Sequence, residues 1–460
     1  MSAPPLWTIA EVARALDLPG TFPETSIDFV TQDSRLVKPG SLFVALSGKP
    51  SGGFVSSFAS ERDGWEFAAN AETAGAVAMI VPHRIEGVSV PQLVVKDTLL
   101  DGLWALARTA RARFKNPVIG LTGSAGKTST KEFIAAYPNA YASPSSFNNF
   151  WGVPLTLCNA DPQATLWVVE MGMNQAGEIL RLSKLAQPTV AMVVNVEPVH
   201  LEKLGSLEAI RQEKISITRG LPEDGVLVLP AGIDAPEWVG RVLRFGVDAE
   251  VRELSHTARG ESWHVSAEIC GNQLEFTLTP GAPHRLQNAL AALASVHAAG
   301  LDAGRLAEKL GDVGIMSGRG VEQAAGGAIL IDDSFNGNPA SMVAALESLK
   351  ARSMNHGRRI AILGDMLELG VDAPAYHEAL AEHLLGIDGV YCVGPLMRHL
   401  YDLLPVGKGL GWHENPATLE PREIAALLKS GDVVVVKGSK KMFWVNRFVP
   451  RLVAALQAKA

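Results

Sequence analysis

The sequence predicts an α/β protein of three domains, with a parallel sheet in the middle domain and a doubly wound sheet in the last. Short apolar runs alternate with helix-compatible stretches along most of the chain, a pattern typical of parallel sheets covered by helices on both faces. A glycine-rich turn, "TGSAGKT", stands between one such run and the next helix-compatible stretch. The length of 460 residues fits about three domains of ordinary size.

Residues 1–96 predict a small N-terminal α/β domain, because their elements are short and their turns frequent. The stretch "TQDSRLVKPGSLFVALSG" is interpreted as a turn followed by a strand over residues 41–46, and "AGAVAMIV" as a second strand.

Residues 97–317 predict the central domain, in which longer helices alternate with the apolar strands "PVIGLTG", "ATLWVVEMG" and "TVAMVVNV". Its residues 226–280 are rich in strand patterns and are interpreted as an excursion appended to the parallel sheet. The helix "HRLQNALAALASVHAAG" follows and carries Leu286, Leu290 and Leu293 along one face.

Residues 318–460 form a second alternating series, which predicts a C-terminal doubly wound, Rossmann-like domain. The apolar strands are "GAILIDDS", "RRIAILGD", "GVYCVG" and "DVVVVKGS". A helix is expected after Pro339, another near residues 375–385, and a last one at the end of the chain.

Composition excludes several classes of protein. The chain has 41 basic and 48 acidic residues, a net charge of -7, and no long basic cluster, which argues against a nucleic-acid partner. Cys158, Cys270 and Cys392 are far apart, so free thiols are expected rather than a disulfide framework. No apolar run approaches the roughly 18 residues of a membrane span, and "MSAPPLWTIAEVARAL" lacks the pattern of a signal peptide. We therefore expect a cytoplasmic protein without membrane insertion.

The glycine-rich turn has the chemistry of a phosphate-binding loop. Gly123 and Gly126 let consecutive N–H groups turn inward, with a helix N-terminus behind them. Lys127 can reach the terminal phosphates of a nucleotide, and Thr128 can offer its hydroxyl to Mg²⁺. The first glycine of the strict phosphate-loop pattern is replaced by Leu121. Nucleotide binding is the expectation, against the alternative of a glycine-rich turn with an exposed lysine.

Polar residues follow several of the expected strands, where open α/β sheets bind ligands. Glu170 ends "LWVVE" and is a candidate Mg²⁺ ligand. His200 follows another strand, where it can face the same edge of the sheet, and a histidine with a purely structural role is the alternative. Lys214 has the pattern of an ordinary exposed helical lysine. "IDDSFNGNPASM" gathers carboxylates and amides at one strand end, and Arg319 at the hinge is a candidate phosphate contact or a plain linker residue.

Taken together, these motifs resemble the Mur ligase family. The resemblance rests on "TGSAGKT", "NNFWGVPLTL", "VVEMG", "HLEKLGS", "HRLQNALAALA", "GRG", "DDSFNGNPASM", "GDMLELG" and "VKGS", and it spans nearly the whole chain. It implies an ATP-dependent ligase that makes an amide bond through an acyl phosphate. The motifs "DDSFNGNPASM" and "GDMLELG" are most similar to members that join D-alanyl-D-alanine to UDP-MurNAc-tripeptide for peptidoglycan synthesis, with these small molecules as partners and a monomer as the expected state.

The resemblance also implies roles for particular residues. Lys127, Glu170, His200 and Lys214 would be catalytic. Two Mg²⁺ ions would be held, one by Thr128 and Glu170 and the other by His200 and by Lys214 carbamylated with CO₂. ATP would be bound by the residues Thr122, Gly123, Ser124, Ala125, Gly126, Lys127, Thr128, Ser129, Asn288, Arg319, Asp333 and Asn336. The substrate residues would be Asp33, Ser34 and Arg35, which would hold the UDP-sugar, together with Asn148 and Asn149.

The chain departs from the family pattern at several positions. Phe335 stands where a tyrosine is usual, Arg285 and Pro230 replace expected asparagines, and Ile215-Ser216 replaces a Gly-Glu pair. Residues 52–65 carry extra length before "DGWEF". Three alternatives therefore stay open: a Mur-type ligase with another amine substrate, a P-loop kinase or ATPase, and a non-catalytic nucleotide-binding regulator.

Overall fold

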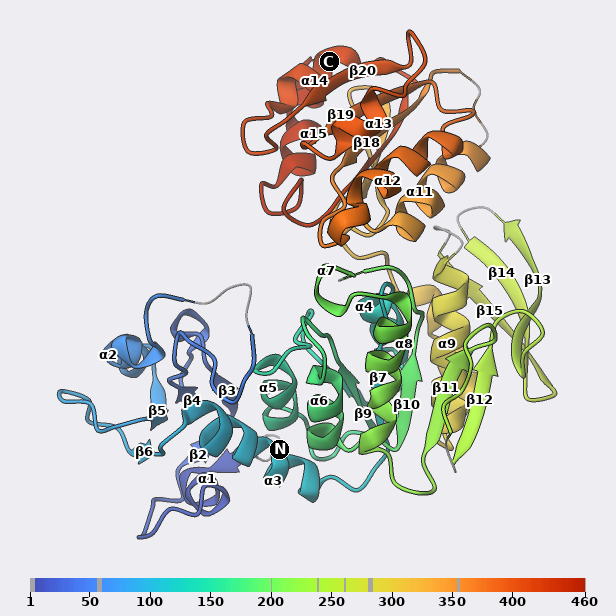
Figure 1. Cartoon of the computed structure of the whole chain (residues 1–460). Coiled ribbons are helices and arrows are strands. Elements are labelled where there is room, and N and C mark those ends of the chain that lie inside the picture. The colour runs from blue at the N-terminus through green and yellow to red at the C-terminus, as the bar shows by residue number, and fades with distance from the viewer. Residues whose placement is uncertain are drawn as a thin grey trace.

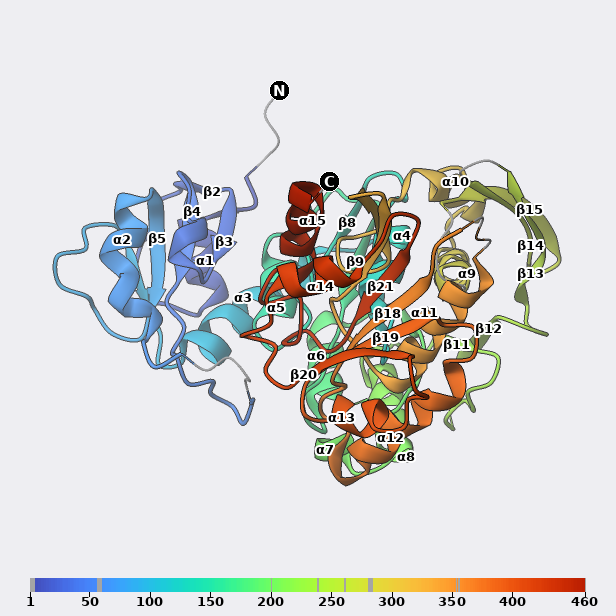
Figure 2. The same cartoon turned by 90° about the horizontal axis from the view of Figure 1, so that it is seen from above.

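The computed structural model describes residues 5–55, 60–199, 201–237, 240–259, 262–279, 284–352, 354 and 356–459. Three bodies follow one another along the chain (Figure 1), each built around its own sheet. The C-terminal body lies over one end of the central one, whereas the N-terminal body projects to the side (Figure 2). Among the described residues, none of the helices combines the length and the hydropathy needed to cross a bilayer.

The N-terminal body contains a four-stranded parallel sheet in the order β3-β4-β5-β6. Its strands are β3 (Phe29–Thr31), β4 (Ser41–Val44), β5 (Ala76–Val81) and β6 (Gln92–Val94), with β1 (Trp7–Thr8) and β2 (Ser26–Ile27) paired beside them. Its helices are α1 (Ile9–Ala15) and α2 (Ala68–Thr73). The strand expected over residues 41–46 is therefore present but ends at Val44.

The central body contains a nine-stranded sheet in the order β15-β14-β13-β12-β11-β10-β7-β9-β8. The strands are β7 (Val118–Thr122), β8 (Ala140–Ala142), β9 (Leu166–Glu170), β10 (Val190–Val193), β11 (Val226–Pro230), β12 (Arg241–Phe245), β13 (Val251–Arg259), β14 (Ser262–Ile269) and β15 (Asn272–Leu278). The interpretation of residues 226–280 as an appended excursion needs correction. β11 pairs in parallel with β10, and β12 with β11, so this region continues the same sheet.

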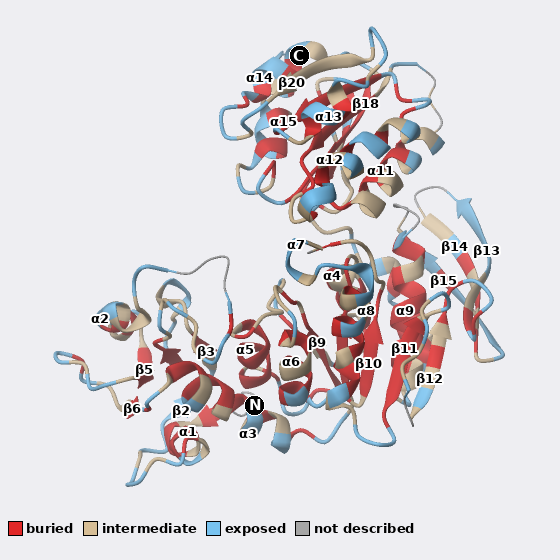
Figure 3. Cartoon of the chain, in the orientation of Figure 1, coloured by how far each residue is buried: buried red, intermediate tan, exposed pale blue. Residues whose placement is uncertain are grey.

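Helices cover both faces of this sheet because alternate strand residues point to opposite sides. Trp167 and Val169 of β9 pack with α3, α5 and α6, whereas Leu166 and Val168 pack with α4 and α9. The helices are α3 (Ala105–Arg113), α4 (Lys127–Ala135), α5 (Gly152–Cys158), α6 (Glu178–Ala186), α7 (Leu201–Leu204), α8 (Leu207–Ile215), α9 (His284–Ala298) and α10 (Ala303–Ala307). Helix α9 is buried on nearly all sides rather than along one face (Figure 3), since its alanines also pack inward.

The C-terminal body contains a six-stranded sheet in the order β16-β17-β21-β18-β19-β20, parallel except for the edge strand β16. Its strands are β16 (Val321–Ala325), β17 (Ala328–Asp333), β18 (Arg359–Gly364), β19 (Gly389–Val393), β20 (Gly409–His413) and β21 (Val433–Lys437). Its helices are α11 (Pro339–Ala351), α12 (Ala373–Glu378), α13 (Met397–Tyr401), α14 (Pro421–Leu427) and α15 (Phe448–Lys459). The three-domain α/β prediction is confirmed, while the boundaries at 96/97 and 317/318 stay predictions.

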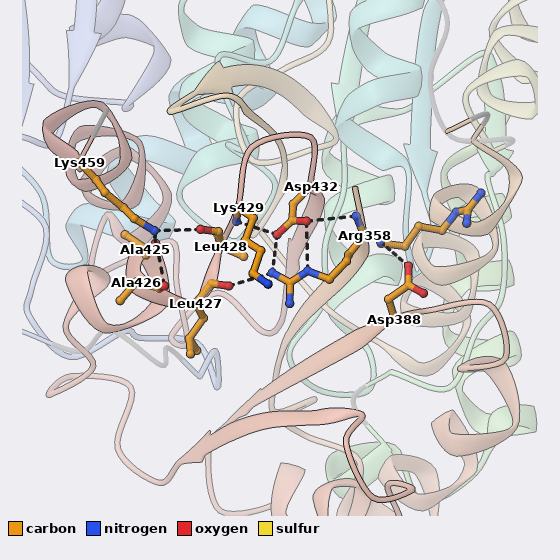
Figure 4. Close-up of polar contacts among 10 residues, drawn as sticks. Arg358, Asp388, Ala425, Ala426, Leu427, Leu428, Lys429, Asp432 and Lys459 are labelled. Atoms are coloured by element: carbon orange, nitrogen blue, oxygen red, sulfur yellow. Dashed lines mark hydrogen bonds and ion pairs between the residues drawn. The ribbon is translucent and has the colours of Figure 1, made fainter. Parts of the chain in front are cut away.

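Two polar clusters lie near the end of the C-terminal sheet at which β18 and β21 begin (Figure 4). Arg358 pairs with the buried Asp432 carboxylate at 2.6 Å and also donates to the carbonyl of Leu427. Lys459, on α15, donates to carbonyls at the end of α14, including that of Leu428 at 2.9 Å. These contacts satisfy carbonyl groups that a helix end leaves unpaired.

Candidate active site

The phosphate-binding loop joins β7 to α4, and its conformation explains its glycines. Gly126 has φ of 73°, and a Cβ there would lie 2.7 Å from the Asn288 side-chain oxygen. Helix α4 begins immediately afterwards at Lys127, whose Nζ donates to the carbonyl of Gly123 at 2.6 Å. The loop therefore folds back on itself in the conformation that aims N–H groups at an anion.

Thr128 and Glu170 meet at the neighbouring ends of α4 and β9. The Thr128 hydroxyl donates to Glu170 Oε1 at 3.3 Å, and Asn148 Nδ2 donates to the same oxygen at 2.7 Å. Glu170 Oε2 is buried without a hydrogen-bond partner among the described residues. An orphaned carboxylate oxygen beside a hydroxyl fits a hard divalent cation such as Mg²⁺. Among the described residues, no group of three or more His, Cys, Asp and Glu side chains is placed to hold a metal ion.

Lys214 is almost fully buried, at 1% exposure, which corrects the expectation of an exposed helical lysine. Burial lowers its pKa well below the usual value, and the charge of Lys127 lowers it further. Burial likewise lowers the pKa of Lys127, against an opposing effect of the Glu170 carboxylate. The preceding Glu213 accepts from the N–H groups that start α6, so α8 is held against that helix. His200 lies outside the described residues.

The C-terminal body reaches the loop through Arg319. Its guanidinium donates to the Thr128 hydroxyl at 3.0 Å and lies 4.3 Å from the centre of the Phe335 ring. Burial lowers the pKa of Arg319, while Glu170 and Asp333 oppose that shift. Asp333 is paired with Lys437 at 2.7 Å. The strand ends of two domains thus converge on one place.

Asn288 stands at the base of a pocket between α4, α9 and the hinge. Its Nδ2 is buried and has no partner among the described residues, so it is free to meet a ligand. Ser129 and Arg319 also line this pocket. Arg285, one of the departures, is held by the carbonyls of Thr279 and Val313 and lies against the Phe133 ring, so it acts as a packed wall. Asn336 is exposed, and its carbonyl accepts from Lys437 at 3.1 Å.

The expected sugar-binding residues lie apart from this centre, at the end of β3. The Asp33 carboxylate caps a turn and pairs with Arg35 at 2.6 Å, Ser34 lies between them, and the Arg35 side chain is largely exposed. Asn149 also plays a local part, since its side-chain oxygen accepts from the N–H of Gly152.

A cavity of about 470 Å³ opens at the neighbouring ends of β4, β5 and β6. Ser47, Lys49, Trp65 and Lys96 are among the residues that line it. Sequence reasoning missed Ser47, Lys49 and Lys96, although polar residues shortly after apolar strands were the available signal.

Asn195 is a further residue that the sequence did not single out. Its side-chain oxygen accepts from the N–H groups of Ser124 and Ala125, both at 2.9 Å. It stands two residues after the end of β10, so its position beyond a buried strand could have drawn attention to it.

The site combines a phosphate-binding loop, a carboxylate and hydroxyl pair suited to Mg²⁺, and an arginine from the C-terminal domain. These features define the class of P-loop enzymes that use a nucleoside triphosphate. The chain belongs to the Mur ligase family: residues 121–296 match the Mur ligase middle domain, and residues 319–440 match the glutamate ligase domain of Mur ligases.

Several relatives of this chain share one name within the family. The UDP-N-acetylmuramoyl-tripeptide–D-alanyl-D-alanine ligase of Escherichia coli is 32% identical over 91% of this chain and 92% of its own length. The Bacillus subtilis ligase of the same name is 30% identical over 84% of both chains. Among solved structures, MurF of Acinetobacter baumannii has a TM-score of 0.82 and 26% identity over 97% of this chain and 99% of its own. MurF of Thermotoga maritima in complex with ADP has a TM-score of 0.77 and 26% identity, over 94% of this chain and 98% of its own.

Proposed function

We propose that the chain joins D-alanyl-D-alanine to UDP-MurNAc-tripeptide at the expense of ATP, a step of peptidoglycan synthesis. The observation that carries the proposal is the contact of Arg319 with Thr128, because it brings the C-terminal domain onto the phosphate loop beside Glu170. The choice of substrates is supported by the resemblance of the motifs and by the names of the relatives.

The reaction has to turn a poor electrophile into a good one. The carboxylate of the tripeptide attacks the γ-phosphorus of ATP, the bond to ADP breaks, and an acyl phosphate forms. The amine of D-alanyl-D-alanine then attacks the acyl carbon, phosphate leaves, and the amine proton is lost to solvent or a base. Both steps depend on positioning and on neutralising phosphate charge.

The chain supplies these effects with a few residues. Lys127 Nζ lies at the Gly123 carbonyl and the Arg319 guanidinium at the Thr128 hydroxyl, and both cations are placed to neutralise phosphate oxygens. Thr128 and Glu170 would hold Mg²⁺, which lowers the charge of the phosphate groups when bound. Asn148 orients the Glu170 carboxylate by donating to Oε1. Asn288 and the pocket beside it would take the adenine, and Asp333, oriented by Lys437, the ribose.

A second ion would rest on Lys214 and His200. An ammonium cannot bind a cation, and the proposed solution is carbamylation, in which the uncharged amine adds CO₂ and releases a proton. The burial of Lys214 supports this proposal, because burial disfavours the charged amine. The anionic product would gain a neighbour of opposite charge in Lys127, which acts electrostatically on Lys214.

The UDP-sugar would occupy the strand ends of the N-terminal domain. The cavity lined by Ser47, Lys49 and Lys96 lies at the same sheet edge as Asp33 and Arg35, and its lysines suit a diphosphate. We propose that the chain acts as a monomer. We also propose that the chain acts in the cytoplasm.

The test measures phosphate release with ATP, Mg²⁺ and UDP-MurNAc-tripeptide, with D-alanyl-D-alanine added or withheld, and identifies the product by mass. Release that requires the dipeptide and yields the pentapeptide supports the proposal. Release indifferent to it would point to a kinase or ATPase, and release with a different amine to another Mur-type ligase. Lys127→Ala should abolish turnover, whereas Lys115→Ala, at an exposed lysine of the same domain, should not.

The carbamate has its own test. Lys214→Ala should lose activity, and short carboxylates should restore part of it. In the unmodified enzyme, removal of bicarbonate should lower activity reversibly. Full activity of the variant without added carboxylate would contradict the carbamate while leaving the ligase assignment intact.

A further inference from the structure

Asn195 makes a contact that an anion usually makes in a phosphate-binding loop. One side-chain oxygen accepts from the successive N–H groups of Ser124 and Ala125, each at 2.9 Å. Successive backbone N–H groups that converge on one acceptor form a nest of the kind that holds a phosphate oxygen. Here that place is taken by a side chain of the chain itself.

The contact is reinforced on both sides. The Ser124 N–H also lies 3.2 Å from the Asn195 carbonyl oxygen. The Ser124 hydroxyl donates to the Glu197 carbonyl at 3.0 Å and accepts from the Glu197 N–H at 2.8 Å. Residues 195–197 therefore clamp the first half of the loop to the end of β10.

The second half of the loop stays available. The N–H groups of residues 126–129, where α4 begins, donate to no acceptor among the residues that the structure describes. These four groups carry the positive end of the helix dipole. The loop is thus divided: its first N–H groups are satisfied internally, and the next ones face outward.

We propose that Asn195 is a positioning residue of nucleotide binding, which holds the phosphate loop in its binding shape by standing in for a phosphate oxygen. ATP and ADP then bind one step along the loop, on the N–H groups of residues 126–129, without first ordering it. Such preorganisation lowers the entropy that binding must otherwise overcome. The inference rests on the proposed function only in taking the ligand to be a nucleotide.

The segment that follows Asn195 extends the consequence to the C-terminal domain. Helix α7 begins six residues later, and the N–H of Glu202 donates to the Glu368 carbonyl of the "GDMLELG" loop at 3.3 Å. Residues 195–199 and 201–204 thus provide contacts to the phosphate loop and to the domain that supplies Arg319. Loss of the Asn195 contact should also loosen this second connection.

The experiment measures the Kd of Mg·ADP by calorimetry for the full chain and for Asn195→Ala, with melting temperature recorded in parallel. Two lost hydrogen bonds predict a Kd raised about 10- to 100-fold, with the KM of ATP raised similarly. The kcat at saturating ATP and the KM of the dipeptide should stay within about threefold. Asn116→Ala is the matched control. Asn116 donates to the Ala164 carbonyl near the start of β7, the strand that leads into the phosphate loop, and this variant should bind Mg·ADP with an unchanged Kd.

Ser124→Ala provides a second variant that keeps both N–H groups but removes the clamp on Glu197. It should raise the Kd less than Asn195→Ala does, and the double variant should resemble Asn195→Ala alone, because both changes act through the same segment. Unchanged or tighter binding by Asn195→Ala, or effects that simply add, would overturn the inference. Failure of the unaltered chain to bind Mg·ADP would instead overturn the proposed function.

Discussion

Replacement of Gly126 by alanine tests whether the phosphate loop and Asn288 are fitted to one another. Gly126 has φ of 73°, where an alanine costs about 1–2 kcal/mol. A Cβ would in addition lie 2.7 Å from Asn288 Oδ1 and 3.3 Å from Asn288 Cγ. Because Asn288 is only 4% exposed, overpacking should add about 1–3 kcal/mol. Together, these two effects should lower the free energy of unfolding by about 2–5 kcal/mol.

Gly300→Ala is the matched control. Gly300 has φ of 72°, follows the same helix α9 that carries Asn288, and has no atom within 4 Å of an added Cβ. Gly300→Ala should lower the free energy of unfolding only by the cost of placing alanine at a positive φ, about 1–2 kcal/mol. A domain of this size shifts its melting temperature by roughly 2–4 °C per kcal/mol, so Gly126→Ala should melt several degrees below Gly300→Ala.

Calorimetric melting and Mg·ADP titration of both variants give the answer. Gly126→Ala should also bind Mg·ADP at least tenfold more weakly, because displacement of Asn288 disturbs the pocket, while Gly300→Ala should bind normally. Adding Asn288→Ala to Gly126→Ala should recover part of the stability but not the affinity. Equal melting temperatures for the two glycine variants, with intact ADP binding by Gly126→Ala, would refute the reasoning.

Three further predictions concern other parts of the chain. Burial raises the pKa of Asp365 from 3.8 to about 6, so between these pH values the folded state binds more protons than the unfolded state. The free energy of unfolding should therefore fall by about 3 kcal/mol as pH rises through that range. Asp365→Asn should lack this loss, and urea titrations from pH 4 to 7 that ran parallel for the two proteins would contradict it. Phe54→Ala should destabilise the fold by about 3–5 kcal/mol. It should also raise the KM of the UDP-substrate but not the Kd of Mg·ADP, since Phe54 stacks at 5.0 Å on Phe150, which lines the cavity proposed for that substrate; an unchanged KM would contradict this reasoning. Asp432→Ala, which breaks the pair with Arg358 in Figure 4, should cost about 2–3 kcal/mol without changing nucleotide affinity, as measured by urea unfolding and ADP titration.

Much of the fold could be predicted because its signals are local. The strands of the parallel sheets are continuous apolar runs, and the glycines, Lys127 and Thr128 follow β7 in an order that only a few structures share. The region 226–280 was misjudged because alternating short strands do not reveal which strand they pair with. Pairing of β11 with β10 depends on residues far away in the sequence.

Some residues of the candidate site could also be predicted from the sequence, and others could not. Glu170 was predictable from its place at a strand end, whereas Lys214 was not, because a helical lysine is exposed unless tertiary packing covers it. The contacts that Asn195 and Arg285 make could not be predicted, since both side chains bind backbone groups of distant segments.

By itself the sequence determined which chemical groups the protein possesses and the order in which strands, loops and helices present them. Only the tertiary structure decided which of those groups meet. Thr128 and Arg319 are separated by 191 positions, and Lys214 becomes a buried amine because α8 is held against α6. The physical reason is that apolar patterning acts over one or two turns of chain, while a hydrogen bond, a buried charge or a pocket depends on distances that only the folded packing sets.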